Sequence, residues 1–181
     1  MKNKKDSQKM LRRDHHINRE DLVGEHPFGD SGQLIFLIVF LVLWILDSFV
    51  FHFSAILAKY IPVYTRLILA GLILIPSGFL AWLGLRVVFM EVRDPPRVIR
   101  TGVFSYMRHP IYFAALLFYI GLIFMTLSLV SLIFWACIFI FYNYIATYEE
   151  KQLEKKFGQE YIDYRKKVPK WIPRLRSSKF D

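Results

Sequence analysis

Residues that could carry chemistry stand on both sides of one long uncharged segment. The motif Tyr106-Met-Arg-His-Pro-Ile-Tyr112 precedes this segment, and Glu149-Glu150 follows it. If the segment folds back on itself, a guanidinium, an imidazole, two phenols and two carboxylates come together. Imidazole and carboxylate groups accept protons, and carboxylates also favour cationic ligands. The spacing therefore predicts one polar site built from two distant parts of the chain.

The uncharged segment is too long for a single membrane helix. It covers the 39 residues 110–148, which as one helix would be roughly 58 Å long, about twice the hydrocarbon thickness of a bilayer. Its polar break, Thr126-Leu127-Ser128, indicates a turn. We therefore predict two helices, 111–125 and 129–148, packed as an antiparallel hairpin.

Two more apolar stretches, 34–57 and 65–88, precede the hairpin, and each is long enough to cross a bilayer. Asp47 falls near the middle of the first stretch, where an unpaired carboxylate would cost a few kcal/mol. It must therefore face protein, water or a substrate. Hydrogen bonds from hydroxyl groups of another span are one interpretation, and acceptor recognition or proton removal is the other.

The distribution of basic residues predicts the topology. Of 24 Lys and Arg, seven lie in 1–33, five in 86–109 and ten in 151–181, whereas only Lys59 and Arg66 lie in or next to the connection between the first two spans. Because basic residues gather on the cytoplasmic side of membrane proteins, we expect an all-α integral membrane protein with four transmembrane helices and both termini in the cytoplasm. The net charge of +9 then reflects topology, and we expect membrane lipids rather than nucleic acid as partners.

The chain divides into a cytoplasmic arm (1–33), spans one and two (34–90) and a region that carries the candidate site (91–181). In the last region, aromatic and aliphatic residues recur at helical spacing beyond the hairpin: Leu153, Phe157, Tyr161, Tyr164 and Val168. They predict an amphipathic C-terminal helix, with a break at Gly158. Its apolar face should lie along the lipid headgroups or cover the loop 91–109.

The loop 91–109 contains Pro95-Pro96 and is expected to be irregular. Irregular backbone near a membrane must be buried by protein or turned toward a ligand, so the loop is a natural wall for a cofactor pocket. Pro110 begins the next helix and leaves the free amides of its first turn near His109. Ordinary ion pairing of Glu149 and Glu150 with Arg108 remains an alternative to a binding role. No spacing of metal ligands is present, so no metal is expected.

The same motifs resemble the isoprenylcysteine carboxyl methyltransferase family, which is similar to the phospholipid N-methyltransferases. The resemblance covers roughly residues 94–174. It includes Gly102-Val-Phe-Ser-Tyr-Met-Arg-His-Pro-Ile-Tyr112, the uncharged hairpin, Glu149-Glu150, Phe157-Gly-Gln-Glu-Tyr161, Tyr164 and Val168-Pro-Lys-Trp-Ile-Pro173.

This resemblance implies a membrane enzyme that uses S-adenosylmethionine, enclosed on the cytosolic side, and methylates a lipophilic acceptor arriving from the bilayer. It implies cofactor contacts from Arg97, Val98, Ile99, Phe104, Arg108, His109, Pro110, Ile111, Tyr112, Glu149 and Glu150. If the acceptor is an amine, Glu150, His109 or Asp47 would take its proton. The expected location is the inner membrane of a prokaryote or the endoplasmic reticulum of a eukaryote.

The sequence leaves several chemical classes of methyl acceptor as alternatives. Eukaryotic enzymes of the family carry an arginine one helical turn before the carboxylate, where this chain has Ile145 and Ala146. A phospholipid-type N-methyltransferase is therefore an alternative to carboxyl O-methylation. A membrane reductase that uses a nicotinamide cofactor and a non-catalytic membrane scaffold are two further alternatives.

Overall fold

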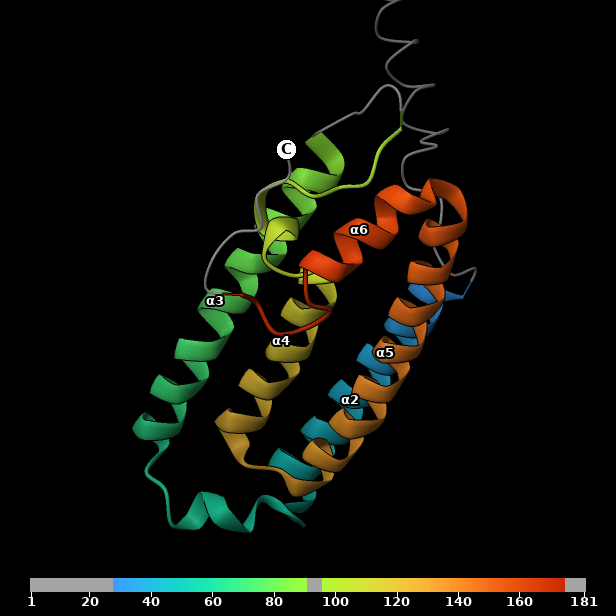
Figure 1. The fold of residues 1–181 in the computed structure, drawn as a ribbon. Coiled ribbons are helices and arrows are strands. Elements are labelled where there is room, and N and C mark those ends of the chain that lie inside the picture. The colour runs from blue at the N-terminus through green and yellow to red at the C-terminus, as the bar shows by residue number, and fades with distance from the viewer. Residues whose placement is uncertain (1–27, 91–95, 175–181) are drawn as a thin grey trace, which may run out of the picture.

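The computed structural model describes residues 28–90 and 96–174, and within these ranges every regular element is a helix. Figure 1 shows the long helices side by side along one axis, with α6 lying across one end of them. The helices are α2 (Gly29–Ile45) with its π-helical continuation η2 (Leu46–Phe51), α3 (Val63–Met90), α4 (Pro110–Thr126), α5 (Leu129–Phe157) and α6 (Gln159–Lys167). Two short 3₁₀ helices, η3 (Ala55–Lys59) and η4 (Gly102–Ser105), lie in the connections. The predicted all-α fold is confirmed for the described residues.

The α4–α5 hairpin is confirmed, with its turn at the predicted position. Leu127 ends α4 in the left-handed conformation, with a φ angle of 57°. Ser128 then caps α5, because its hydroxyl accepts a hydrogen bond from the backbone amide of Ser131 at 3.1 Å. This reversal brings the end of α5 back to the level of His109, which is what the two-part site requires.

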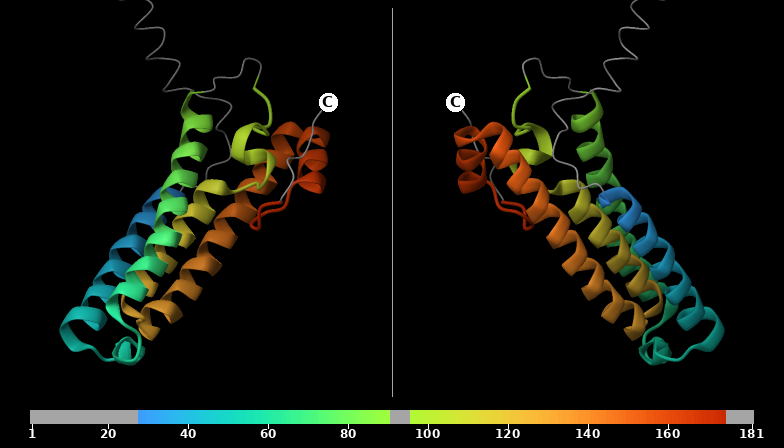
Figure 2. Two further views of the ribbon diagram at one scale, coloured as in Figure 1. Left: turned by 90° about the vertical axis from the view of Figure 1, so that its left-hand side faces the viewer. Right: turned by 90° about the vertical axis from the view of Figure 1, so that its right-hand side faces the viewer.

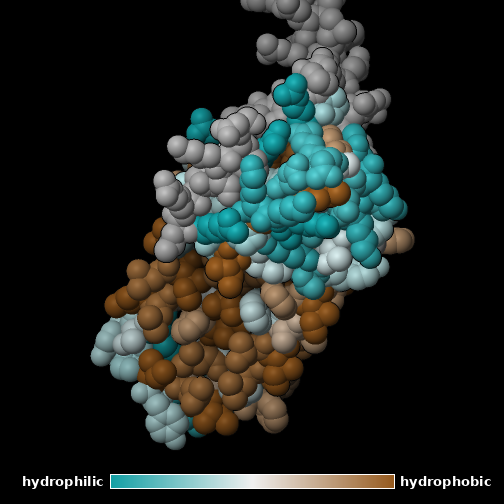
Figure 3. Space-filling view, viewed as in Figure 1, coloured by the Kyte–Doolittle hydropathy of each residue, from teal (hydrophilic) through white to brown (hydrophobic). Residues whose placement is uncertain are grey.

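The bundle has the surface of a protein that lies in lipid. Three of its helical segments, Gly29–Phe51, Val63–Phe89 and Leu129–Phe157, are long and apolar enough to cross a membrane, whereas Pro110–Thr126 is a shorter apolar helix. Large apolar side chains stay exposed along one face of α3: Ile68, Leu72, Ile75, Phe79 and Trp82. In Figure 3 the shaft of the bundle is mostly hydrophobic, and the end that carries α6 is hydrophilic. Such a continuous apolar belt is unfavourable in water and favourable in a bilayer.

Small residues let α3 and α4 approach closely. A Cβ atom added at Gly84 would lie 2.7 Å from the Ile111 side chain, and one added at Gly121 would lie 2.5 Å from Leu74. Ser77 adds a hydrogen bond from its hydroxyl to the carbonyl oxygen of Ala114, at 2.8 Å. Close backbone approach of this kind stabilises helix pairs where lipid supplies no hydrophobic driving force. The start of α4 is thereby fixed against α3.

The C-terminal segment covers the loop, which is the second of the two predicted arrangements. The chain breaks at Gly158, where φ is +54°, and α6 turns back over the end of the bundle (Figure 2). Tyr161, Tyr164 and Val168 are buried against Val98 of the loop. The phenol of Tyr164 also donates to the carbonyl oxygen of Phe104 at 2.8 Å. The amphipathic face is thus buried within the protein and forms a roof over the end of the hairpin.

The prediction that Asp47 lies near the middle of the first span is wrong. The first helix begins at Gly29 rather than at residue 34, so Asp47 lies in η2, at the far end of this helix. It is buried there, and its carboxylate accepts hydrogen bonds from the Ser54 amide at 2.8 Å, the Ser54 hydroxyl at 2.6 Å and the Ser128 hydroxyl at 2.5 Å. Hydroxyl groups of another element therefore satisfy the carboxylate, and they tie the end of the first helix to the α4–α5 turn.

Candidate functional site

A cavity of about 360 Å³ lies between the ends of the long helices and the roof formed by α6. Ten of the eleven predicted cofactor-contact residues line it: Arg97, Val98, Ile99, Phe104, Arg108, His109, Pro110, Ile111, Tyr112 and Glu149. Cavities of about 300–1,000 Å³ are typical of sites for small molecules and cofactors. The loop, the start of α4 and the end of α5 therefore converge on one space of ligand size.

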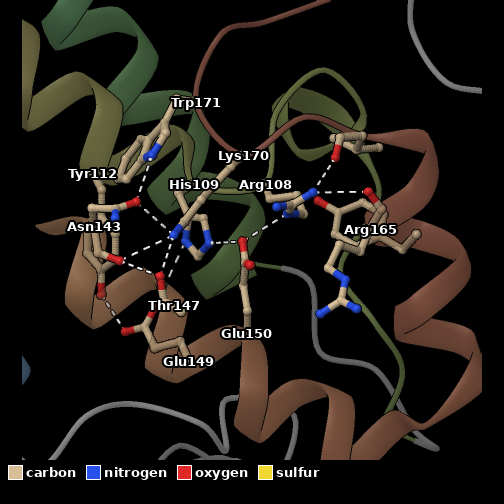
Figure 4. A network of polar contacts seen from close by, with 12 residues as sticks. Arg108, His109, Tyr112, Asn143, Thr147, Glu149, Glu150, Arg165, Lys170 and Trp171 are labelled. Carbon is tan, nitrogen blue, oxygen red and sulfur yellow. Dashed lines mark hydrogen bonds and ion pairs between the residues drawn. The ribbon is translucent and has the colours of Figure 1, made fainter.

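Glu150 is the predicted contact residue that does not line the cavity. Its Oε1 atom accepts from the Nε–H of Arg108 at 2.9 Å and lies 3.0 Å from Nε2 of His109. The predicted alternative, an ion pair with Arg108, is therefore present at Glu150. This pair is nearly buried, and Glu150 links the cavity-lining side chains of Arg108 and His109. Figure 4 shows the three side chains in one row. The contacts of the Glu150 carboxylate are thus with Arg108 and His109, both of which line the cavity.

His109 is buried, and the geometry defines which of its nitrogens carries the proton. Because the carboxylate of Glu150 is an acceptor, Nε2 carries the hydrogen and donates it. Nδ1 then presents its lone pair toward Glu149, whose Oε2 lies 3.9 Å away. Burial lowers the pKa of His109, and the hydrogen bond to Glu150 opposes that effect only in part. The imidazole is therefore neutral at pH 7, with the lone pair of Nδ1 on the Glu149 side.

Tyr112 and Glu149 form the second pair in the cavity wall. The Tyr112 phenol donates to Oε1 of Glu149 at 2.5 Å. The Tyr112 ring also lies parallel to the imidazole of His109, with 5.7 Å between ring centroids and 2° between planes. Residues 109 and 112 share a face because they are one helical turn apart at the start of α4. One carboxylate and two flat rings thus face the same space.

Arg108 connects the hairpin to the roof. Besides its bond to Glu150, its Nη1 donates to the carbonyl oxygens of Arg165 at 3.0 Å and Val168 at 2.6 Å. These carbonyls lie at the C-terminal end of α6, where a cation is favoured by the helix dipole. The guanidinium therefore holds the roof closed over the cavity.

Asp47 is not part of this arrangement. Its partner Ser128 follows the C-terminal end of α4, whereas His109 precedes the N-terminal end of the same 17-residue helix. At about 1.5 Å per residue these two ends are about 26 Å apart. The structure brings His109, Glu149 and Glu150 together and leaves Asp47 at the opposite end of the bundle.

The sequence patterns did not predict several residues of the site. Gly29, Asp30 and Gln33, from the first turns of α2, line the cavity together with Leu85 and Phe89 of α3. The start of α2 at Gly29 brings Asp30 to this level. A second set, Asn143, Thr147, Lys170 and Trp171, forms a polar cluster next to His109 (Figure 4).

Comparison with known proteins agrees with this geometry. Residues 66–160 match the family model described as phospholipid methyltransferase. Among curated proteins, the chain is 32% identical over 78 residues to protein-S-isoprenylcysteine O-methyltransferase B of Arabidopsis thaliana, which is 42% of this chain and 40% of the relative. It is 35% identical over 81 residues to the Schizosaccharomyces pombe protein-S-isoprenylcysteine O-methyltransferase, covering 42% and 33% of the two chains.

The Homo sapiens enzyme of the same name is 30% identical over 96 residues, which is 52% of this chain and 34% of the relative. The chain thus spans between a third and two fifths of the length of these relatives. The family model, in contrast, covers just over half of this chain, from within α3 to within α6, and so includes the whole hairpin. On this match, the chain belongs to the phospholipid methyltransferase family.

Proposed function

We propose that the protein is an integral membrane methyltransferase that uses S-adenosylmethionine and methylates a lipophilic acceptor. The observation that carries the proposal is the cavity walled by His109, Tyr112 and Glu149, at the polar end of an otherwise apolar bundle. A methyl donor from water and an acceptor from lipid meet most directly at such a boundary. The family match and the names of the relatives support the same reaction class.

The residues around the cavity suit the chemical groups of this donor. Glu149 is an acceptor for an ammonium group or for ribose hydroxyls, and the rings of Phe104 and Tyr112 offer flat surfaces to an adenine. The first-turn amides of α4, next to Pro110, favour a carboxylate. The donor supplies a methyl group on a positively charged sulfur, so the electrophile needs no further activation by the protein.

The side chains then have three tasks. Tyr112 and the apolar lining keep Glu149 oriented and exclude water from the space beside it. Arg108 holds the roof in place through α6. If the methylated group is an amine, His109 takes up the proton that the amine loses. Its Nδ1 can do so because that nitrogen carries no hydrogen while Nε2 donates to Glu150. Glu150 is accordingly a positioning residue in this proposal.

We also propose four spans, with α4 as the fourth and shortest. At 17 residues it is about 26 Å long, close to the hydrocarbon thickness of about 30 Å. Both termini and the cavity then face the cytoplasm, on the side where the basic residues gather. The membrane would be the inner membrane of a prokaryote or the endoplasmic reticulum of a eukaryote.

The test is a titration of the purified full-length protein, in neutral detergent micelles, with S-adenosylhomocysteine and separately with NADPH. We expect S-adenosylhomocysteine to raise the thermal unfolding midpoint, by an amount equivalent to about 2.7 kcal/mol at a hundredfold excess over Kd. Glu149→Gln should weaken this effect. The matched control is Glu154→Gln, because Glu154 pairs with the partly exposed Arg165 and does not line the cavity. Absence of stabilisation by S-adenosylhomocysteine would overturn the proposal, and stabilisation by NADPH alone would favour a reductase.

A further inference from the structure

Lys170 is a partly buried cation that is held by neutral oxygens. Its Nζ donates to the backbone oxygen of Asn143 at 3.2 Å, to the side-chain oxygen of Asn143 at 2.9 Å and to the hydroxyl of Thr147 at 2.7 Å. Within the described parts of the chain, no carboxylate oxygen forms an ion pair with it at 4.0 Å or less. The positive charge is therefore fixed in place without a direct counter-ion.

Burial opposes this charge. Burial is the largest effect on Lys170 and lowers its pKa, and the attraction of Glu150, which is stronger than the repulsion from Arg108, offsets that effect only in part. Glu150 already pairs with Arg108. The direct partners of Lys170 are these neutral oxygens and the Trp171 ring, whose centroid lies 5.6 Å from Nζ. A positive group that is partly removed from water and has only neutral partners gains from binding an anion, because charge-assisted hydrogen bonds are stronger than neutral ones. The weakest of its three hydrogen bonds, to the Asn143 backbone oxygen, is the one that an anion would replace.

The surface next to Lys170 changes from polar to apolar along one face of α5. Trp135, Phe139, Asn143 and Thr147 follow one another at intervals of four residues, so they share a face. The Trp171 ring lies 5.8 Å from the Phe139 ring, and the Phe139 ring lies 5.8 Å from the Trp135 ring. Three aromatic rings thus run from the level of Lys170 toward the apolar middle of the bundle.

This face also reaches the proposed active site. The Trp171 ring lies 5.8 Å from the imidazole of His109, and the Trp171 indole donates to Asn143 at 3.2 Å. Figure 4 shows the Lys170 ammonium between Asn143, Thr147 and His109. A molecule with its charged end on Lys170 would therefore have that end beside a residue of the cavity wall, and its apolar chain along the rings.

We propose that Lys170, held by Asn143 and Thr147, binds the anionic group of an amphiphilic methyl acceptor whose apolar chain lies along Phe139 and Trp135. This inference rests on the proposed methyltransferase function and adds the charge of the acceptor to it. A carboxylate and a phosphate share the required chemistry. Such an anion could belong to the acceptor or to a bulk membrane lipid, and the experiment separates these two sources.

The experiment measures binding rather than turnover. The full-length protein, saturated with S-adenosylhomocysteine in neutral micelles, is titrated by calorimetry with S-farnesylthioacetic acid and with its uncharged methyl ester. The wild type and Lys170→Arg should bind the acid about tenfold more tightly than the ester, because only the acid forms a charge-assisted hydrogen bond. Lys170→Gln should bind both about equally. Lys151→Gln, a matched control at an exposed lysine of the same region, should behave like the wild type.

Three outcomes overturn the inference. One is an unchanged preference for the acid in Lys170→Gln, and another is a wild type without such a preference. The third is full competition by phosphatidylglycerol at equal concentration, which would assign the cation to bulk anionic lipid. Binding of S-adenosylhomocysteine by each variant is measured first, so that loss of donor binding, which would contradict the proposed function, is distinguished from loss of acceptor binding alone.

Discussion

His109 and Glu150 are 41 residues apart in the sequence, and in the structure Nε2 of His109 lies 3.0 Å from Oε1 of Glu150. The same oxygen accepts from Arg108 at 2.9 Å. One carboxylate thus contacts an imidazole and a guanidinium at once, although it does not line the cavity. Its removal would leave two cavity-lining side chains without their common partner.

The first prediction concerns Arg108. Arg108→Lys keeps the charge but cannot make the same set of directed bonds to Glu150, Arg165 and Val168. We expect a loss of about 1.5–3 kcal/mol in unfolding free energy, measured by thermal unfolding in micelles. Arg100→Lys is the matched control, because Arg100 and Glu160 form a pair whose side chains are 31% and 30% exposed. Surface pairs contribute about 1 kcal/mol or less, and equal losses in the two variants would contradict the role assigned to Arg108.

The second prediction concerns the pair Tyr112 and Glu149. Tyr112→Phe removes the hydrogen bond that orients the carboxylate, so the donor is held less well. We expect kcat/KM for methyl transfer to fall about tenfold, as the loss of one bond to a charged group implies. In Glu149→Gln the additional effect of Tyr112→Phe should be smaller, because the two residues act together. Additive effects in the double variant would show that they act independently.

The third prediction is a pH dependence of stability. Because burial lowers the pKa of His109 in the folded protein, the unfolded chain binds a proton there at a higher pH than the folded chain does. The contribution of His109 to the unfolding free energy is therefore fully present above the usual histidine pKa of about 6.5. It is lost as the pH falls below that value toward the lower pKa of the folded protein. The slope from one such group is at most about 1.4 kcal/mol per pH unit.

The measurement compares the unfolding midpoints of the wild type and His109→Gln from pH 7.5 to pH 5. The difference between the two proteins removes the contribution of other titrating groups. We expect the wild type to lose more stability than the variant over this interval. Parallel curves would show that His109 titrates alike in the folded and unfolded chains.

The fourth prediction separates Asp47 from the cavity. Asp47→Asn weakens the contacts with Ser54 and Ser128, so we expect a loss of about 1–3 kcal/mol in unfolding free energy. Binding of S-adenosylhomocysteine should change by no more than about twofold, since distant sites act nearly independently. Ser128→Ala should lower stability in the same way. A folded Asp47→Asn protein of normal stability that has lost donor binding would refute this placement.

The sequence alone determined the parts of this protein that depend on local pattern. A run of 39 uncharged residues must reverse direction in a bilayer, and the only polar break in it, at Thr126-Leu127-Ser128, placed the reversal correctly. The helical spacing of Tyr161, Tyr164 and Val168 predicted the buried face of α6. The motif around His109 indicated the cavity wall, because its residue types and their order are characteristic of one family.

Only the tertiary structure decided what each carboxylate contacts. Glu149 and Glu150 are adjacent in the sequence, but successive helical residues point about 100° apart, so one faces the cavity and the other faces Arg108. Asp47 lies at the far end of its helix, and not near its middle as predicted, because that helix begins at Gly29, before the apolar run. Lys170 contacts Asn143 and Thr147 because the chain after α6 returns to α5. These contacts join residues far apart in the sequence, and such pairings depend on how helices pack rather than on any local pattern.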